Sequence, residues 1–484
     1  MLLLPRILLG PMHPMINITM IAILLPSRFS VLFNNKVVSM MTKNIVIVAV
    51  FSILIPVVAL AAVSPREAEQ LKGNLTPLGA ERAGNSDGSI PEWRGGYVTP
   101  IPGSGSGKYP DPFSEEKPIV SITEKNVGQY ADKLSDGVVA LLKKYPSYRV
   151  DVYPTHRTAG APVWVYDNTF KAATQAKLTP DGLSFTGAWG AVPFPIPRNG
   201  NEVMWNHLVR PHPASVDVDF RVFVGTPDGK RSMASKAVIN EQSNYYVKDG
   251  SAEQYNDVYQ FYRFNITAPS FKAGERVLVH ETLDMDKEPQ AWQYLVGQRR
   301  VRRAPTLSYD TPDFMASGAN YFDEIYGLRS RLDRYDWKLV GKHEMYIPYN
   351  NNRFFAAGDE KAFVPFHTNP DHVRWELHRV WEVEATLASG KRHAVPKRRF
   401  YIDEDSWAIL LVDGYDAEGK LWRTSQVMNM IVPEAEMLAT NFTAVYNLEA
   451  NTLAALQYVD TLKIIPPRKT GYFSPNAMAS DTAR

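Results

Sequence analysis

The stretch FYIDEDSWAILLVDGYDAEGKLWRTSQV, residues 400–427, contains two apolar segments joined by a short polar turn. Aromatic and β-branched residues fill both segments, and residues 416–419 separate them with a glycine. This pattern is typical of two paired β-strands. Trp407 and Trp422 stand near the starts of the two strands, and no recognisable catalytic motif lies between them. The pair is therefore predicted to line a wall, not to carry chemistry.

The same alternation of apolar and polar residues continues on both sides of this pair from about residue 214. Turn signals such as Pro227-Asp228-Gly229 and Ser389-Gly390-Lys391 separate the segments. Short turns force neighbouring strands to be antiparallel, so we expect a meander. The predicted strands lie within 215–225, 276–285, 291–304, 335–349, 373–387, 392–405, 407–416 and 421–432.

Helical spacing is less frequent. Thr123 is predicted to cap a helix that runs to about residue 142, before the stop at Pro146. Further helices are expected at 167–178, after Asn199, and at 321–328. The fold class is therefore mainly β with α. A strongly curved antiparallel sheet with helices across its open side buries many aromatics and can leave a ligand cavity.

Composition excludes several classes of function. Of the 484 residues, 45% are hydrophobic and 21% are charged, which are globular values. The formal net charge of +2 gives no basic excess for nucleic acid, and the absence of cysteine excludes disulfides, thiolate metal sites and cysteine nucleophiles.

The N-terminal region reads as an export signal. Residues 40–61 combine a lysine, an apolar core and the small residues Ala59-Leu60-Ala61, which predicts a cleaved signal peptide and a periplasmic protein that starts near Ala62. Residues 1–39 contain four prolines and are predicted to be a mis-annotated upstream extension. The first 61 residues hold four positive charges and no acid, so their removal changes the net charge from +2 to −2.

The mature chain is predicted to have three parts. Residues 62–120 are rich in glycine and proline and are expected to form an irregular arm. Residues 121–465 are expected to form a single β domain with a helical lid. Residues 466–484 are expected to be a flexible tail.

Several motifs are weak. GSGSGK, residues 103–108, lacks the first glycine and the final serine or threonine of a phosphate loop, and residues 83–93 lack two ligands of a calcium loop. A linker and a tight turn are the expected structures. His367, His372 and His378 lie close in sequence, but no metal site is predicted from them, because the closing carboxylate is not evident.

Two charged segments leave alternatives open. Asp403, Glu404 and Asp405 form an acidic turn, where solvated charge is the ordinary explanation and a hydrolase with paired carboxylates is the alternative function. QRRVRRAP, residues 298–305, places Arg300 and Arg302 on one face of a strand. These two arginines are candidates for binding an acidic partner or a lipid phosphate, or form a solvated strand end.

Several longer stretches of the sequence point to a specific protein family. Taken together with the acidic turn and its flanks, they resemble the proteobacterial domain-of-unknown-function 1329 (DUF1329) family, whose members are often labelled outer-membrane lipoprotein-sorting proteins. The resemblance covers roughly residues 64–460, and it rests on LTPLGAERAGNSDGSIPEW, FPIPRNGNEVMWNH, YDWKLVGKHEMYIPYNN, HRVWEVEATL and KRRFYIDEDSWAILLVDGYDAEGKLWR.

The resemblance implies a fold, a location and partners. The fold is an incomplete antiparallel barrel closed by helices, like that of the periplasmic lipoprotein carriers LolA and LolB, with an apolar cavity for acyl chains. The implied location is the periplasm. The implied partners are an inner-membrane exporter of the resistance-nodulation-division (RND) type and an outer-membrane protein. It implies no catalytic residue.

The predicted function is therefore a carrier or chaperone for a lipid or another hydrophobic molecule, with no cofactor, no metal and no enzyme activity expected. Each buried methylene contributes about 0.8 kcal/mol, so an aromatic and aliphatic cavity can hold an acyl chain without specific chemistry. The candidate cavity-wall residues are Trp292, Tyr294, Trp337, Trp381, Phe400, Trp407 and Trp422.

Overall fold

A computed structural model describes residues 63–287, 290–304 and 309–480. The predicted upstream extension and signal peptide lie outside the described residues. Among those that are described, no helix has the length and apolar character needed to cross a membrane.

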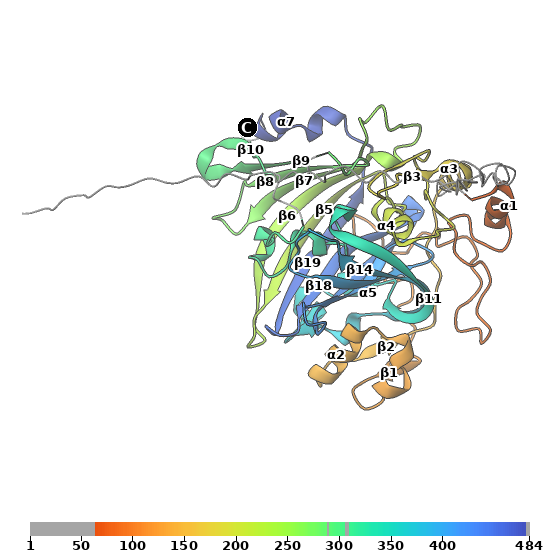
Figure 1. The fold of residues 1–484 in the computed structure, drawn as a ribbon. Coiled ribbons are helices and arrows are strands. Elements are labelled where there is room, and N and C mark those ends of the chain that lie inside the picture. Colours follow the sequence, from red (N-terminus) through yellow and green to blue (C-terminus); the bar gives the residue numbers. More distant parts are fainter. Residues whose placement is uncertain (1–62, 288–289, 305–308, 481–484) are drawn as a thin grey trace, which may run out of the picture. The chain divides into compact units, whose positions relative to one another are not determined.

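A single curved sheet of 15 strands organises the described residues (Figure 1). Two antiparallel meanders, β5 to β10 and β14 to β19, are joined edge to edge because the last strand, β19, pairs with β5. β11 pairs with β14 along its length, and β1 and β2 extend the sheet beyond β14. The strands of this sheet are β1 (Val120–Ile122), β2 (Val150–Val152), β5 (Ser215–Gly225), β6 (Arg231–Ser243), β7 (Val258–Ala268), β8 (Arg276–Thr282), β9 (Gln290–Leu295), β10 (Arg300–Arg303), β11 (Tyr335–Pro348), β14 (Trp375–Leu387), β15 (Lys397–Asp403), β16 (Ile409–Tyr415), β17 (Leu421–Val432), β18 (Met437–Asn447) and β19 (Thr452–Ile464).

The expected fold class, a mainly β structure with a curved, open antiparallel sheet, is confirmed. Each of the eight predicted segments contains at least one observed strand, and the segment 291–304 holds two, β9 and β10. The predicted turns also connect strands: Gly229, Gly390 and Gly419 all have φ between 75° and 79°, the left-handed conformation that glycine adopts readily.

Six strands of the sheet were not predicted: the short strands β1 and β2, and β6, β7, β18 and β19. The sequence of β19, TLAALQYVDTLKI, contains leucine and alanine in runs that favour a helix as much as a strand. β6 begins with the polar run RSMASK, which hides its alternation. β19 also pairs with β5, which is far away in the sequence, and a local pattern does not show such pairing.

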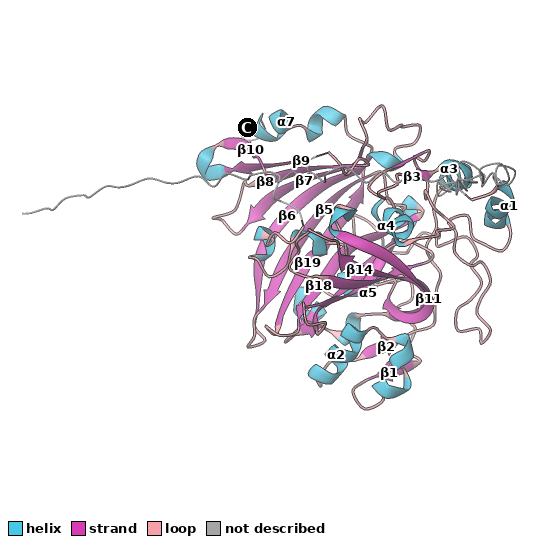
Figure 2. Cartoon of the chain, in the orientation of Figure 1, coloured by secondary structure: helices cyan, strands magenta, loops and turns pink. Residues whose placement is uncertain are grey.

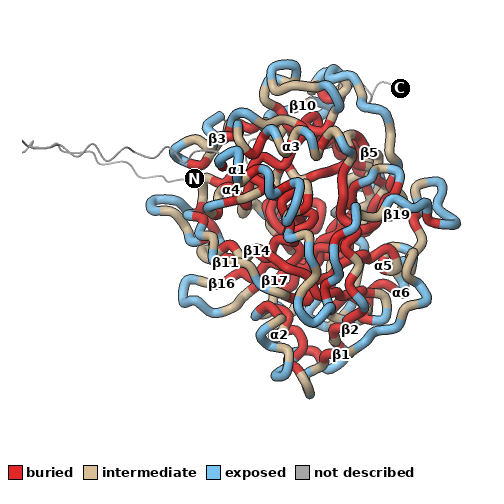
Figure 3. The backbone as a smooth tube through the Cα atoms, turned by 90° about the vertical axis from the view of Figure 1, so that its right-hand side faces the viewer, coloured by how far each residue is buried: buried red, intermediate tan, exposed pale blue. Residues whose placement is uncertain are grey.

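Apolar side chains cover both faces of the sheet, and most of its strands are buried in Figure 3. The inner face of the curve packs against α3 (Val163–Gln175), α4 (Gly200–Leu208) and residues 309–337. The outer face packs against α2 (Asp136–Lys144) and α7 (Pro475–Ser480), which lie outside the curve at its two ends (Figures 1 and 2). The remaining short elements are α1 (Pro65–Ala68), α5 (Asn352–Ala356), α6 (Asp359–Ala362), β3 (Lys177–Leu178), β4 (Phe185–Thr186), β12 (Phe363–Val364) and β13 (His367–Thr368).

The helix predictions were partly wrong. The expected helix from Thr123 to residue 142 is broken: two 3₁₀ turns occupy its first half, and α2 starts only at Asp136. Asn126 bonds the Thr123 backbone instead of continuing a helix, and Ser135 caps α2 by accepting from Val138. The helix after Asn199 is confirmed as α4, which Asn199 caps through the Glu202 backbone.

Residues 309–334 cross the inner face as a strap of 3₁₀ turns. The strap contains η6 (Phe314–Ala316), η7 (Phe322–Glu324) and η8 (Leu332–Arg334). The helix predicted at 321–328 is therefore only the single turn η7. Tyr326 and Gly327 adopt φ of 57° and 82°, which is incompatible with a continuing α-helix.

Both chain ends of the described part are packed. Residues 63–119 form the expected irregular arm, with only α1 and a 3₁₀ turn as regular structure, and Asp87 accepts from the Ser89 backbone in the expected tight turn. The prediction of a flexible tail at 466–484 is wrong for residues 470–480. They form a 3₁₀ turn and α7, and bury Phe473 and Met478 against β7 to β9.

Candidate functional site

Four of the predicted wall residues meet on the inner face. Trp337, Trp381, Phe400 and Trp407 belong to one apolar cluster, in which the rings of Trp381 and Trp407 stack with centroids 6.3 Å apart. Trp337 and Phe400 lie 5.6 Å apart. Trp407 is fully buried, and its indole N–H donates to the Leu78 carbonyl of the arm at 2.9 Å. This cluster, which we call the tryptophan cluster, is closely packed core.

The other predicted site residues lie elsewhere. Trp292 and Tyr294 of β9 face outward and pack with Phe473 and Met478 of the C-terminal segment. Trp422 is half-buried at the start of β17. Arg300 and Arg302 project from the edge strand β10, where the Arg302 guanidinium donates to Gln293 at 3.2 Å. The structure therefore does not gather the nine predicted residues into one site.

An apolar cavity lies on the inner face beneath the strap, away from the tryptophan cluster. Its free volume is about 20 Å³, which admits about one water molecule. The strands contribute mainly valine, leucine and phenylalanine, and the strap covers them with Phe314, Met315, Phe322 and Ile325. The strand residues that line this cavity are Phe220, Val222, Phe264, Val277, Val279, Leu456 and Gln457.

A second, more polar cavity adjoins the first. It has a free volume of about 40 Å³ and shares Val279, Phe322 and Arg329 with the apolar cavity. His280, Glu281 and Thr282 of β8 and Ser330 and Arg331 of the strap form much of its remaining wall. Arg329 therefore lies where the apolar cavity meets the polar cavity.

The strap is attached more firmly in its second half than in its first. Glu324 accepts two hydrogen bonds from Arg423 of β17, at 2.7 and 2.8 Å, and Asp323 contacts His393 and Arg398 at 2.9 Å. The first half is held to the sheet by backbone carbonyls: Met315 accepts from Ser235 and Phe314 from Lys272. A movement that opens the cavity would therefore start in the first half.

The acidic turn is buried, which corrects the expectation of solvated charge. Asp403, Glu404 and Asp405 are at most 3% exposed. Arg157 binds Asp405 with two hydrogen bonds of 2.7 and 2.8 Å, and Arg379 and Lys342 contact Glu404. Arg157 also donates to the arm carbonyls of Glu81, Arg82 and Pro91. The turn therefore ties the arm to the sheet.

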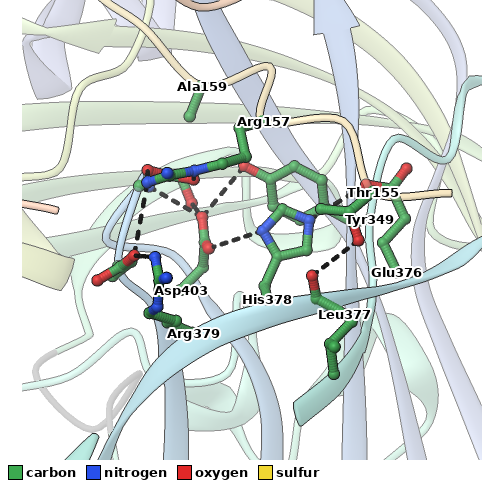
Figure 4. A network of polar contacts seen from close by, with 12 residues as sticks. Thr155, Arg157, Ala159, Tyr349, Glu376, Leu377, His378, Arg379 and Asp403 are labelled. Atoms are coloured by element: carbon green, nitrogen blue, oxygen red, sulfur yellow. Dashed lines mark hydrogen bonds and ion pairs between the residues drawn. The ribbon is translucent and has the colours of Figure 1, made fainter. Parts of the chain in front are cut away.

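His378 of β14 lies between two carboxylates in this network (Figure 4). Its Nε2 is 3.1 Å from Glu376 and its Nδ1 is 3.5 Å from Asp403. Burial alone would lower the pKa of His378, but hydrogen bonding and charge from Asp403 and Glu376 outweigh it and raise the pKa to about 9. The imidazole is thus positively charged at neutral pH.

The negative charge of Asp403 balances the positive charge of His378. Burial would raise the pKa of Asp403, but the bond with charged His378 and two bonds from Ser406 hold it below the usual value. Tyr349 donates a further hydrogen bond to the same carboxylate at 3.1 Å. The result is a compensated ion network.

The same groups provide a test of metal binding. His378, Asp403 and Asp405 each place a ligand atom within 4.8 Å of the others. A cation there would have to replace the proton of His378 and lie beside the guanidinium of Arg157, which already occupies Asp405. The donor set therefore fits an ion network better than a metal. His367 is buried and its ring contacts Ser147, whereas His372 lies apart at a 3₁₀ turn.

Sequence reasoning missed the residues at the two cavities, chiefly Arg329, Ser330 and Gln457. Gln457 offers a signal, because a glutamine interrupts the apolar run Leu453-Ala454-Ala455-Leu456 and Tyr458. Arg329 gives none, since an arginine in an irregular segment is ordinarily solvated.

Comparison with known proteins gives a family. The family described as protein of unknown function (DUF1329) matches residues 121–479. An uncharacterized protein of Pseudomonas aeruginosa is 44% identical over 375 residues, which cover 76% of this chain and 82% of that relative.

Two solved structures show more distant similarity. A DUF1329 family protein from Desulfovibrio piger has 15% identity and a TM-score of 0.38, and the match covers 55% of this chain and 92% of that one. A LolA superfamily protein from Nitrosomonas europaea has 11% identity and a TM-score of 0.35, and the match covers 58% of this chain and 100% of that one.

Proposed function

The chain belongs to the DUF1329 family, and we propose that it is a periplasmic carrier that binds a lipid or another hydrophobic molecule on the inner face of its sheet. The observation that supports the proposal is the apolar cavity beneath the strap. It lies between strands of the sheet and a strap of short 3₁₀ turns, which is where a binding protein needs a removable cover.

The energetics agree with a hydrophobic ligand. The strands beneath the strap present a continuous apolar surface that is now covered by Phe314, Met315 and Phe322. An acyl chain that replaced these side chains would leave water, which contributes about 0.8 kcal/mol per methylene, while the displaced side chains would become exposed at a similar cost per unit of area. Binding is therefore favourable for a chain that buries more apolar surface than the strap exposes.

The hydrolase alternative receives no support from the acidic turn. Asp403 and Asp405 are at most 3% exposed and are bound by Ser406, Tyr349 and Arg157. Paired carboxylates that hydrolyse glycosides must face a substrate and a water molecule. These carboxylates face cations and hydroxyl groups of the protein.

The test is the binding of an apolar fluorescent probe, N-phenyl-1-naphthylamine, to the purified protein. We expect saturable binding that added lipid reverses. Val222→Phe, which fills the cavity from β5, should weaken the affinity for the probe about ten-fold or more. Val340→Phe introduces the same side chain at an exposed position of β11 and should leave the affinity unchanged. Equal effects of the two substitutions, or no saturable binding, would contradict the proposal.

The proposal includes the predicted partners, an RND-type exporter and an outer-membrane protein, to which the ligand would be passed. Cross-linking in living cells followed by purification of the protein should recover them. Mass spectrometry of lipids that co-purify with the protein would identify the natural ligand in the same preparation.

A further inference from the structure

We propose that the ligand is an anionic amphiphile, with its apolar chain beneath the strap and its carboxylate or phosphate head group bound by Arg329. This inference rests on the proposed carrier function and adds the chemical class of the ligand. Three observations on the described residues carry it: the position of Arg329, a guanidinium that donates no hydrogen bond, and polar atoms without partners around the two cavities.

Arg329 stands at the boundary between the two cavities. Its side chain lines both of them, together with Val279 and Phe322. On one side lie the apolar residues of β5, β7 and β8, and on the other side lie His280, Glu281 and Ser330. A molecule with a chain in the first cavity would place its polar end at this guanidinium.

The guanidinium of Arg329 is held by few direct contacts, although the buried carboxylates of Glu241 and Asp313 also stabilise its charge. The side chain is 11% exposed, and its ion pair is with Glu281, whose carboxylate oxygen is 3.5 Å from Nε. The guanidinium otherwise lies over the rings of Tyr262, at 3.8 Å, and Phe264, at 5.7 Å. In the part of the chain that the structure describes, the guanidinium donates no hydrogen bond. Five N–H donors in a planar fork match a carboxylate or a phosphate.

Polar atoms at the cavity walls also lack partners. Gln457 is 4% exposed and lines the apolar cavity, and its Oε1 has no hydrogen bond among the described residues. Ser330 lines the polar cavity, and its buried Oγ has none either. Buried side-chain atoms without a partner occur at several places in the described part of the chain, but these two line adjoining cavities, where the polar group of a ligand would reach them.

The backbone holds Gln457 in an unusual conformation. Its φ is 57°, in the left-handed region, and it lies in the irregularity where the register of β19 against β5 shifts between Ala455 and Tyr458. Such bulges turn a side chain away from the regular alternation, and strained residues of this kind cluster at binding sites. Here the bulge directs an amide into a wall whose other polar residues are Asp313 and Arg329.

The attachment of the strap fits this ligand. Asp323 and Glu324 anchor the second half of the strap, and the Arg329 backbone N–H donates to the Asp323 carbonyl at 3.0 Å. The first half, which carries Phe314 and Met315, has fewer ties. Lifting the first half would open the apolar surface, while Arg329 would stay in place to receive the head group.

The experiment measures binding of three probes to the full-length protein by calorimetry, below their micelle-forming concentrations. Dodecanoate carries the chain and the anion, 1-dodecanol carries the chain alone, and inorganic phosphate carries the anion alone. We expect dodecanoate to bind at least ten-fold more tightly than 1-dodecanol, and phosphate to bind not at all. Arg329→Gln should weaken dodecanoate at least ten-fold and leave 1-dodecanol unchanged.

Arg334→Gln is the matched control, because Arg334 lies in the same strap but lines neither cavity. It should leave both affinities unchanged. Equal affinity of the wild-type protein for dodecanoate and 1-dodecanol would overturn the head-group assignment while leaving the carrier function intact. Binding of phosphate alone would overturn the amphiphile class. Failure of both chain-bearing probes to bind would overturn the carrier function itself. The comparison of probes on the wild-type protein decides the matter even if Arg329→Gln does not fold.

Discussion

The inner face of the sheet has two halves that are filled in different ways. Over β14 to β16, the rings of Trp381 and Trp407 stack in the tryptophan cluster, and the buried ions of the acidic turn are matched by Arg157, Arg379 and His378. Over β5 to β8 and β19, the strap leaves two cavities and an arginine whose guanidinium donates no hydrogen bond among the described residues. The first half is built for stability, and the second half tolerates rearrangement.

The largest difference should appear when the tryptophan cluster is opened. Trp407→Ala removes a fully buried indole, its stacking on Trp381 and its bond to the arm, and should lower the free energy of unfolding by about 3–5 kcal/mol. Trp422→Ala, at a half-buried position, should cost about 1 kcal/mol or less. Urea unfolding of both variants checks this, and equal losses would remove the distinction between the two tryptophans.

A slightly smaller loss is expected when the ion network loses one partner. Arg157→Met leaves the buried carboxylate of Asp405 without its two hydrogen bonds and should cost about 3 kcal/mol. Arg149→Met is the control, because Arg149 pairs with Asp151 and Asp371 at a partly exposed position and should cost less than about 1 kcal/mol. Limited proteolysis should also release the arm faster in Arg157→Met, which a general loss of stability outside the arm would not explain.

The network should also make stability depend on pH. The pKa of His378 is raised from 6.5 to about 9 in the folded protein, so the folded state binds the proton more tightly than the unfolded state. This contribution is fully present below about pH 6.5 and is lost as the pH rises through 9. The free energy of unfolding should therefore fall across this interval. His378→Gln should flatten the pH dependence, and an unchanged slope in that variant would assign it to other groups.

The smallest expected effect is the change in stability caused by one added methyl group, which should differ between the two halves. Val222→Ile adds a methyl group next to the cavity beneath the strap and should change stability by less than about 1 kcal/mol, or increase it. Val383→Ile adds the same group in the fully buried tryptophan cluster and should destabilise by about 1–3 kcal/mol. Thermal unfolding resolves this difference, and equal destabilisation would mean that the cavity half is as tightly packed as the other.

The two halves also differ in how far the sequence predicts them. The strands of the first half, such as Trp381 to Ala385, alternate clearly because one of their faces is apolar and the other binds solvent and ions. Val383 and Ala385 are accordingly buried, as the alternation predicts. The second half contains β6, β7 and β19, whose sequences are ambiguous, and β19 pairs with β5 over a long distance along the chain.

The site could be predicted only in outline. An apolar cavity within a curved sheet follows from the abundance of aromatic residues, but the aromatics themselves form core, and valine and phenylalanine side chains line the cavity. The burial of Asp403 and Asp405 depends on Arg157, which is about 250 residues away in the sequence. Neither the charge pairing nor the position of Arg329 can be read from local spacing, because tertiary contacts create both.

The pairing of β19 with β5 has a consequence for how the chain reaches its folded state. Residue 225 lies opposite residue 453, so the first meander keeps one bare edge until nearly the whole polypeptide is present. A bare edge strand pairs readily with other chains, and contacts so distant in sequence form slowly. If the protein is exported as proposed, β5 to β10 leave the membrane before β14 to β19. The edge of β5 then stays unpaired until β19 has also crossed. Its biogenesis should therefore depend on a holding chaperone on the far side of the membrane, and truncation before β19 should yield aggregates instead of a smaller soluble domain.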